Sequence, residues 1–74
     1  MDRQKFRDRM DFKNGWGLSL VSGPGTNSNE GTFEVAVLDP KGNINFDYTD
    51  GEVLSYQSIA DIENIAKVIS GIRN

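Results

Sequence analysis

The chain has 74 residues and a formal net charge of −3, and it contains neither cysteine nor histidine. These absences exclude disulfides, thiolate metal sites and imidazole bases, and the acidic balance argues against binding nucleic acid through its phosphates. We therefore expect one small domain that is not an enzyme and carries no cofactor.

The N-terminal segment is basic, whereas the remainder of the chain is acidic. Phe6 and Met10 lie four residues apart, which is the spacing of one face of a short helix. This spacing predicts a short helix over residues 2–13, with Asn14-Gly15 as its stop. We interpret residues 1–14 as a basic arm or short helix, and residues 15–74 as a single domain.

Two strands are predicted next in the chain. Residues 16–22 alternate, with Trp16, Leu18 and Leu20 on one face. The glycines at 15 and 17 indicate close backbone packing or a bulge around this tryptophan. Residues 32–39 form the longest mainly apolar run, so we expect them to be a central strand of the sheet.

Residues 22–31 separate these two strands, and proline is their one apolar residue. The composition predicts a mobile loop, longer than an ordinary hairpin connection, and long loops on a rigid scaffold often carry function. A phosphate-binding loop is not indicated, because no Lys-Ser or Lys-Thr pair follows the glycines.

Turn residues and alternation predict two further strands. Asp39-Pro40-Lys41-Gly42-Asn43 is a hairpin turn in which Asp39 bonds to the turn backbone. Residues 44–49 alternate as a strand, Asp50-Gly51 forms a two-residue turn, and residues 52–57 form a strand at an edge of the sheet. An exposed edge can pair with another chain.

Residues 58–73 carry the pattern of an amphipathic helix. Ser58 and Asp61 resemble a capping box at its start. Its apolar residues recur at helical spacing: Ile62, Ile65, Ala66, Ile69 and Ile72. The predicted fold class is α+β, a four-stranded antiparallel β-meander with a C-terminal helix packed on one face and a short N-terminal helix.

Two site hypotheses are weaker than the alternatives. A divalent cation would need an acidic set, here Asp39, Asp47, Asp50 and Glu52, but their spacing matches no calcium loop. Base stacking would use Phe46, Tyr48 and Tyr56, but these strands carry no Lys or Arg. We predict neither a metal site nor a nucleic-acid site.

Three stretches together suggest a family. They are Phe6-Arg7-Asp8-Arg9-Met10-Asp11-Phe12-Lys13-Asn14-Gly15, then Gly17-Leu18-Ser19, then Phe33-Glu34-Val35-Ala36-Val37-Leu38-Asp39 with Gly42-Asn43. In this pattern the chain resembles small proteins encoded by phages and prophages of Gram-positive bacteria. The resemblance implies an accessory phage protein that inhibits a host protein or defence system, and it implies no particular site residues.

The leading hypothesis is a non-enzymatic phage-type protein that binds and modulates a host protein in the host cytoplasm. Its predicted contact residues are Arg3, Arg7, Arg9, Trp16, Gly23, Thr26, Asn27 and Asn29. The first alternative is a homo-oligomer that sequesters a small, nucleotide-like ligand through the arm arginines. The second is a structural or virion-associated protein. No run approaches the ~18 apolar residues of a membrane span, so no membrane association is expected.

Overall fold

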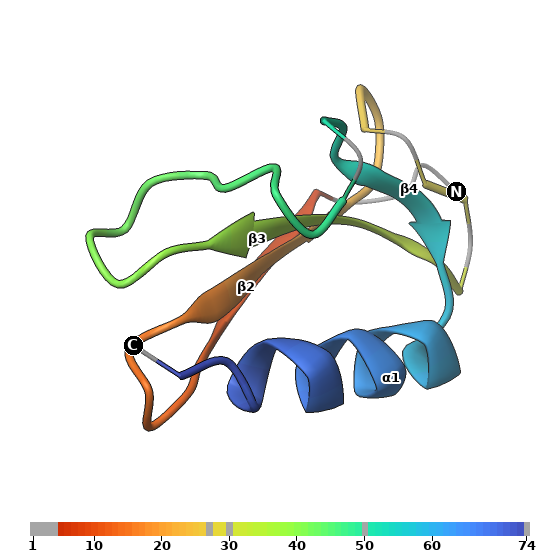
Figure 1. Cartoon of the computed structure of the whole chain (residues 1–74). Coiled ribbons are helices and arrows are strands. Elements are labelled where there is room, and N and C mark those ends of the chain that lie inside the picture. The colour runs from red at the N-terminus through yellow and green to blue at the C-terminus, as the bar shows by residue number, and fades with distance from the viewer. Residues whose placement is uncertain (1–4, 27, 30, 50, 74) are drawn as a thin grey trace.

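The computed structural model describes residues 5–26, 28–29, 31–49 and 51–73. Four strands form one antiparallel sheet in the order β1-β2-β3-β4, and a single helix lies across one face (Figure 1). The elements are β1 (Phe6–Asp11), β2 (Gly17–Ser22), β3 (Phe33–Leu38), β4 (Leu54–Gln57) and α1 (Ile59–Ser70). The predicted α+β class, with its four-stranded antiparallel sheet and C-terminal helix, is confirmed.

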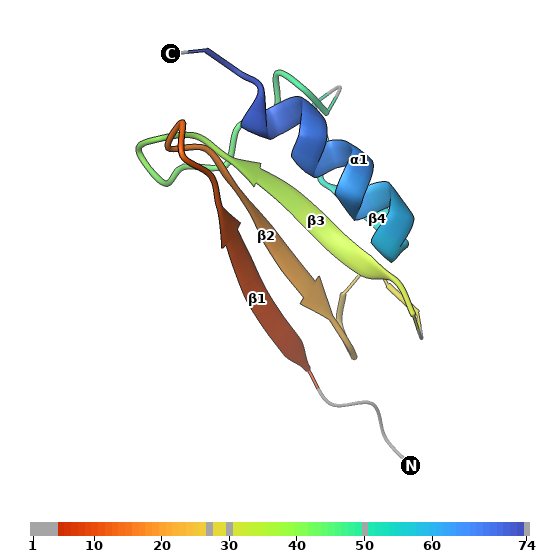
Figure 2. The same ribbon diagram turned by 90° about the horizontal axis from the view of Figure 1, so that it is seen from below.

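The N-terminal segment is a strand, so the predicted helix within residues 2–13 is wrong for every residue that the structure describes there. β1 pairs antiparallel with β2 from Phe6↔Ser22 to Asp11↔Gly17 (Figure 2). An isolated helix of this length with two apolar anchors is marginal, whereas pairing with β2 satisfies the backbone groups of alternate residues and sets the Phe6 ring against Phe33. Asn14-Gly15 therefore forms a hairpin tip instead of a helix stop.

This first hairpin closes on Phe12, whose N–H donates to the Trp16 carbonyl at 2.8 Å, while the Gly15 N–H donates to the Phe12 carbonyl at 3.0 Å. Gly15 has φ +91°, which L side chains rarely adopt. A Cβ at Gly17 would lie 2.5 Å from the Met10 carbonyl oxygen. The expectation of close backbone packing around Trp16 is therefore confirmed.

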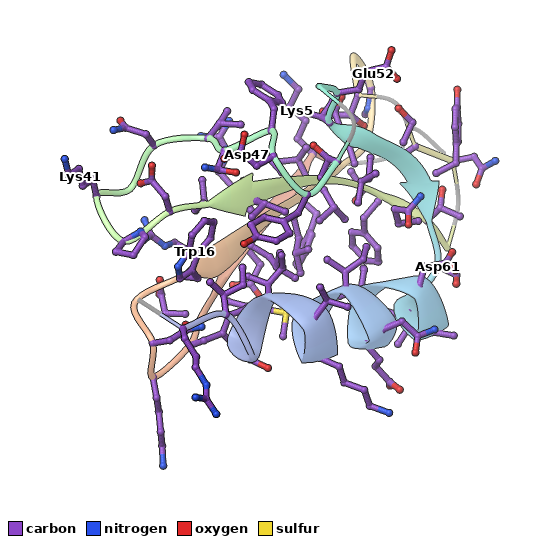
Figure 3. All side chains as sticks on the ribbon, viewed as in Figure 1. Lys5, Trp16, Lys41, Asp47, Glu52 and Asp61 are labelled. Atoms are coloured by element: carbon purple, nitrogen blue, oxygen red, sulfur yellow. The ribbon has the colours of Figure 1, made fainter. Side chains whose placement is uncertain are left out.

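The second hairpin uses the same kind of turn. The Asp39 N–H donates to the Asn43 carbonyl at 2.9 Å, and Gly42, at φ +84°, donates back to the Asp39 carbonyl at 2.9 Å. Asp39 Oδ1 accepts from the N–H groups of Lys41 and Asn43 at 2.9 and 3.0 Å, as the sequence predicts. Lys41 lies at the tip of this hairpin, away from the helix (Figure 3).

The strand predicted over residues 44–49 does not form. After the Leu38↔Ile44 bridge and an N–H···O bond of 2.8 Å from Asn45 to Val37, the chain leaves the sheet. Residues 46–49 and 51–53 lie on a detour outside the sheet, in which the Thr49 N–H donates to the Phe46 carbonyl at 3.2 Å. The alternation of these residues predicted a buried face, but the sheet edge is instead filled later, by β4.

The detour places the half-exposed Tyr48 edge-to-face against Trp16, with ring centroids 5.6 Å apart at 88°. The predicted edge strand over residues 52–57 is confirmed over residues 54–57, as β4. Its register with β3 shifts between Phe33 and Val35, and Tyr56 sits there at φ +56°. The predicted turn at Asp50-Gly51 falls partly outside the described residues.

The core lies between the sheet and α1. Its most deeply buried side chains, each at most 1% exposed, come from β2, β3 and α1: Leu18, Val35, Val37 and Ile69. α1 begins at the predicted capping box, in which the Asp61 N–H donates to Ser58 Oγ at 3.2 Å. It ends at Ser70, three residues before the predicted end, where Gly71 caps the last carbonyls.

Candidate interaction surface

The helix covers only part of one face of the sheet. It packs chiefly against β2 and β4, and Figure 2 shows β1 on the far side of β2 from the helix. A groove of about 630 Å³ runs between β1 and α1. It is lined by residues from both elements and from the strands between them: Phe6, Asp8, Met10, Phe12, Leu20, Phe33, Ile59, Ile62, Glu63, Ala66, Lys67 and Ser70.

The groove is mainly apolar and open. Phe6 is 45% exposed although its ring packs edge-to-face on Phe33 at 5.7 Å, and Ile59 at the start of α1 is 57% exposed. Asp8 on β1 and Glu63 on α1 are the carboxylates that line it. Exposed apolar surface next to a partly empty sheet face is typical of an interaction site.

β1 is an edge strand of the sheet, and its residues line the groove. The backbone edge of β1 that faces away from β2 therefore lies at the margin of the groove. The Phe12 N–H donates to the Trp16 carbonyl, so the backbone groups of Phe12 face the second strand of the hairpin. In an antiparallel ladder this direction alternates from one residue to the next. Met10, Asp8 and Phe6 therefore direct their backbone groups to β2, whereas Arg7, Arg9 and Asp11 direct theirs outward. The Arg9 N–H accordingly donates to Asp8 Oδ1 at 2.8 Å instead of to β2.

On the opposite face of the sheet, a smaller hollow of about 260 Å³ brings Arg7 and Thr26 together, and both were predicted contact residues. Lys5, Gly25 and Glu34 also line it. Thr26 is held by its hydroxyl, which donates to the Gly23 carbonyl at 2.6 Å. The first turn of the 22–31 loop, which contains the predicted contact residues Gly23 and Thr26, is therefore held by local hydrogen bonds.

The other predicted contact residues lie apart. Arg9 is farther along β1, where its Nε–H donates to Asp11 Oδ1 at 2.8 Å. Asn29 bonds to Thr32 within the loop, and its N–H donates to Thr32 Oγ1 at 2.8 Å. Trp16 is only 9% exposed and lies on the helix side of the sheet (Figure 3). Gly23 is buried, and Arg3 and Asn27 lie outside the described residues.

The groove residues themselves were missed as a site by sequence reasoning. Phe6 and Met10 were assigned to one face of a helix, where they would dock instead of forming an open surface. The signal that could have found them is the alternation of Phe6, Asp8, Met10 and Phe12, which is equally compatible with a strand.

Within the described part of the chain, no group of three or more His, Cys, Asp or Glu side chains is placed to hold a metal ion. Among the same residues, no helix is both long and apolar enough to cross a membrane. No protein-family model matches the sequence, and neither the curated proteins nor the solved structures contain a significant match to it.

Proposed function

We propose that this chain is a small, non-enzymatic accessory protein of the phage type, and that it binds and modulates a protein of the host cell. The observation that carries the proposal is the open groove between β1 and α1. It places exposed Ile59 of α1 across from exposed Phe6 of the edge strand β1, so that an apolar surface lies next to backbone groups that face away from β2.

The openness of the groove and the small volume of the other hollow favour a macromolecule over a small ligand. The groove is open along its length, and a small ligand is normally enclosed over most of its surface. The hollow beside Arg7 is enclosed more fully, but its volume of about 260 Å³ is below that of ordinary ligand sites.

A nucleotide-like ligand remains the second candidate because Lys5, Arg7 and the Thr26 hydroxyl border that smaller hollow. Glu34 lines the same hollow and opposes an anion there. Native mass spectrometry of the purified chain separates the two candidates. A multiple of the subunit mass with a discrete small added mass would favour the ligand, whereas a large added mass after incubation with lysate favours a protein.

The test of the groove uses two exposed residues of α1. Ile59 lines the groove, whereas Val68, which is 60% exposed, does not. We expect Ile59→Arg to reduce capture of the partner from a lysate of the cells that carry the gene by about tenfold or more, because it replaces apolar contact surface with a long charged side chain that is costly to bury. Val68→Arg should capture as much as the unmodified chain.

Quantitative mass spectrometry of the captured proteins, with thermal unfolding to show that both variants fold, gives the readout. Equal capture by Ile59→Arg and Val68→Arg, or loss of capture in both, would contradict a role for the groove.

A further inference from the structure

We propose that the edge of β1 binds an extended segment of the partner, which adds to the sheet as a fifth strand and carries a basic side chain opposite Asp8. This inference rests on the proposed function, since it states what kind of segment the partner presents. It is argued from the direction of the β1 backbone, from the order of charges along β1, and from the position of Asp8.

The backbone of β1 is ready for such pairing. Arg7, Arg9 and Asp11 direct their N–H and C=O groups outward from β2, by the alternation of the β1–β2 ladder. All three residues are exposed. Outward-facing groups at alternate residues are the arrangement that an added strand needs in order to form its own ladder.

The side chains of β1 define what the added strand should carry. Phe6, Asp8 and Met10 share the groove face, and Arg7, Arg9 and Asp11 share the other face. Residues directly opposite one another interact, and opposite charges stabilise the pair. Read from Asp11 back to Phe6, an antiparallel complement is therefore basic, apolar, acidic, basic, acidic and apolar.

A second copy of this chain does not meet that requirement. A two-fold symmetric dimer through β1 would pair the two strands antiparallel, so that the residue opposite Asp8 must come from the same face of the other copy. The candidates on that face are Phe6, Asp8, Met10 and Phe12, and none is basic. An inward-pointing charge of this kind normally protects an edge from self-pairing. The edge therefore favours a different chain over its own copy.

Asp8 also occupies one of the backbone groups of the edge. Its carboxylate accepts a hydrogen bond from the Arg9 N–H at 2.8 Å, and this N–H is one of the groups that an added strand must use. A Lys or Arg opposite Asp8 forms an ion pair with the carboxylate and releases the Arg9 N–H to the new ladder. A segment without that basic residue would leave the Asp8 carboxylate unpaired beside apolar surface, which is costly.

The experiment uses the full chain, labelled with ¹⁵N, and two capped peptides of identical composition. One has the complementary order Lys-Val-Glu-Lys-Glu-Val, and the other has its charges exchanged, Glu-Val-Lys-Glu-Lys-Val. We expect the complementary peptide to shift the amide signals of Arg7, Arg9 and Asp11, with an affinity about tenfold above that of the exchanged peptide. Asp8→Asn should reduce this preference, because it removes one of the four charge pairs that distinguish the two peptides, whereas Asp47→Asn, away from β1, should leave it unchanged.

Equal binding of both peptides, or no shift at these three amides up to millimolar peptide, would overturn the inference. So would concentration-dependent shifts of the same amides without peptide, since those would identify a second copy as the occupant. The proposed function has a separate readout: if the peptides fail while Ile59→Arg still abolishes capture of the partner, strand addition is wrong and the groove stands.

Discussion

At the scale of single residues, the start of α1 depends on a reciprocal pair. Asp61 Oδ2 accepts from the Ser58 N–H and from Ser58 Oγ, both at 2.9 Å, and the Asp61 N–H donates back to that hydroxyl at 3.2 Å. The hydrogen bonds from the Ser58 backbone and side chain lower the pKa of the Asp61 carboxyl from its ordinary value of 3.8. Folding therefore favours the ionised carboxylate.

This shift predicts a pH dependence. Since the pKa of Asp61 is lower in the folded chain than in the unfolded one, its stabilising effect is complete above the unfolded pKa and is lost as the pH falls through the folded pKa. Asn at this position can still accept from Ser58 but does not titrate. We expect the melting temperature of the unmodified chain to exceed that of Asp61→Asn at pH 7, and the gap to narrow as the pH falls below 3.8, the ordinary pKa of the carboxyl. A gap independent of pH would contradict the role of the charge.

At the scale of elements, α1 stabilises the fold through the one helix face that packs on the sheet. Ile69 is 1% exposed in the core, whereas its neighbour Val68 is 60% exposed. The isoleucine spacing located this buried face correctly. Val68, although apolar, lies on the solvent side of the helix.

We expect Ile69→Ala to lower the free energy of unfolding by about 2–5 kcal/mol, since it leaves a cavity between α1 and the sheet. Val68→Ala, on the same helix, should change it by less than about 0.5 kcal/mol. Denaturant unfolding, followed by the fluorescence of the single tryptophan, Trp16, measures both. Similar losses for the two variants would mean that the helix is seated differently.

At the scale of the whole molecule, the two ends of the fold are joined by Asn14. Its Nδ2 donates to the carbonyls of Ile69 and Ile72, each at 2.9 Å, and its Oδ1 accepts from the Trp16 N–H at 3.0 Å. The tip of the first hairpin thus satisfies carbonyls at the end of α1, which a helix cannot satisfy internally. One side chain holds the N-terminal hairpin and the C-terminal helix together.

Asn14→Asp tests this link, because it keeps the acceptor for Trp16 and removes the donors to α1. We expect a loss of about 1–3 kcal/mol of unfolding free energy. Hydrogen exchange should show faster opening at the last turn of α1 than in its first turn. If exchange at both ends of the helix is unchanged, the contact to Ile69 and Ile72 does not hold the helix end.

The sequence alone determined the features that depend on neighbouring residues. The capping box at Ser58, the turn at Asp39 and the apolar runs of β2, β3 and α1 follow from local spacing, and the structure has all of them. Of the predicted contact residues, Arg7 and Thr26 line the same hollow and Trp16 is buried. Their contact with a partner stays a prediction.

Tertiary structure decided what local pattern left ambiguous. Phe6 and Met10 fit a helix or a strand, and in the folded chain they pair with β2 as a strand. Residues 44–49 alternate like a strand, but after the bridge at Ile44 they leave the sheet, and Tyr48 packs against Trp16. The groove exists because one helix covers only part of a four-stranded face. Such outcomes depend on contacts between residues far apart in the chain, so the spacing within one segment cannot specify them.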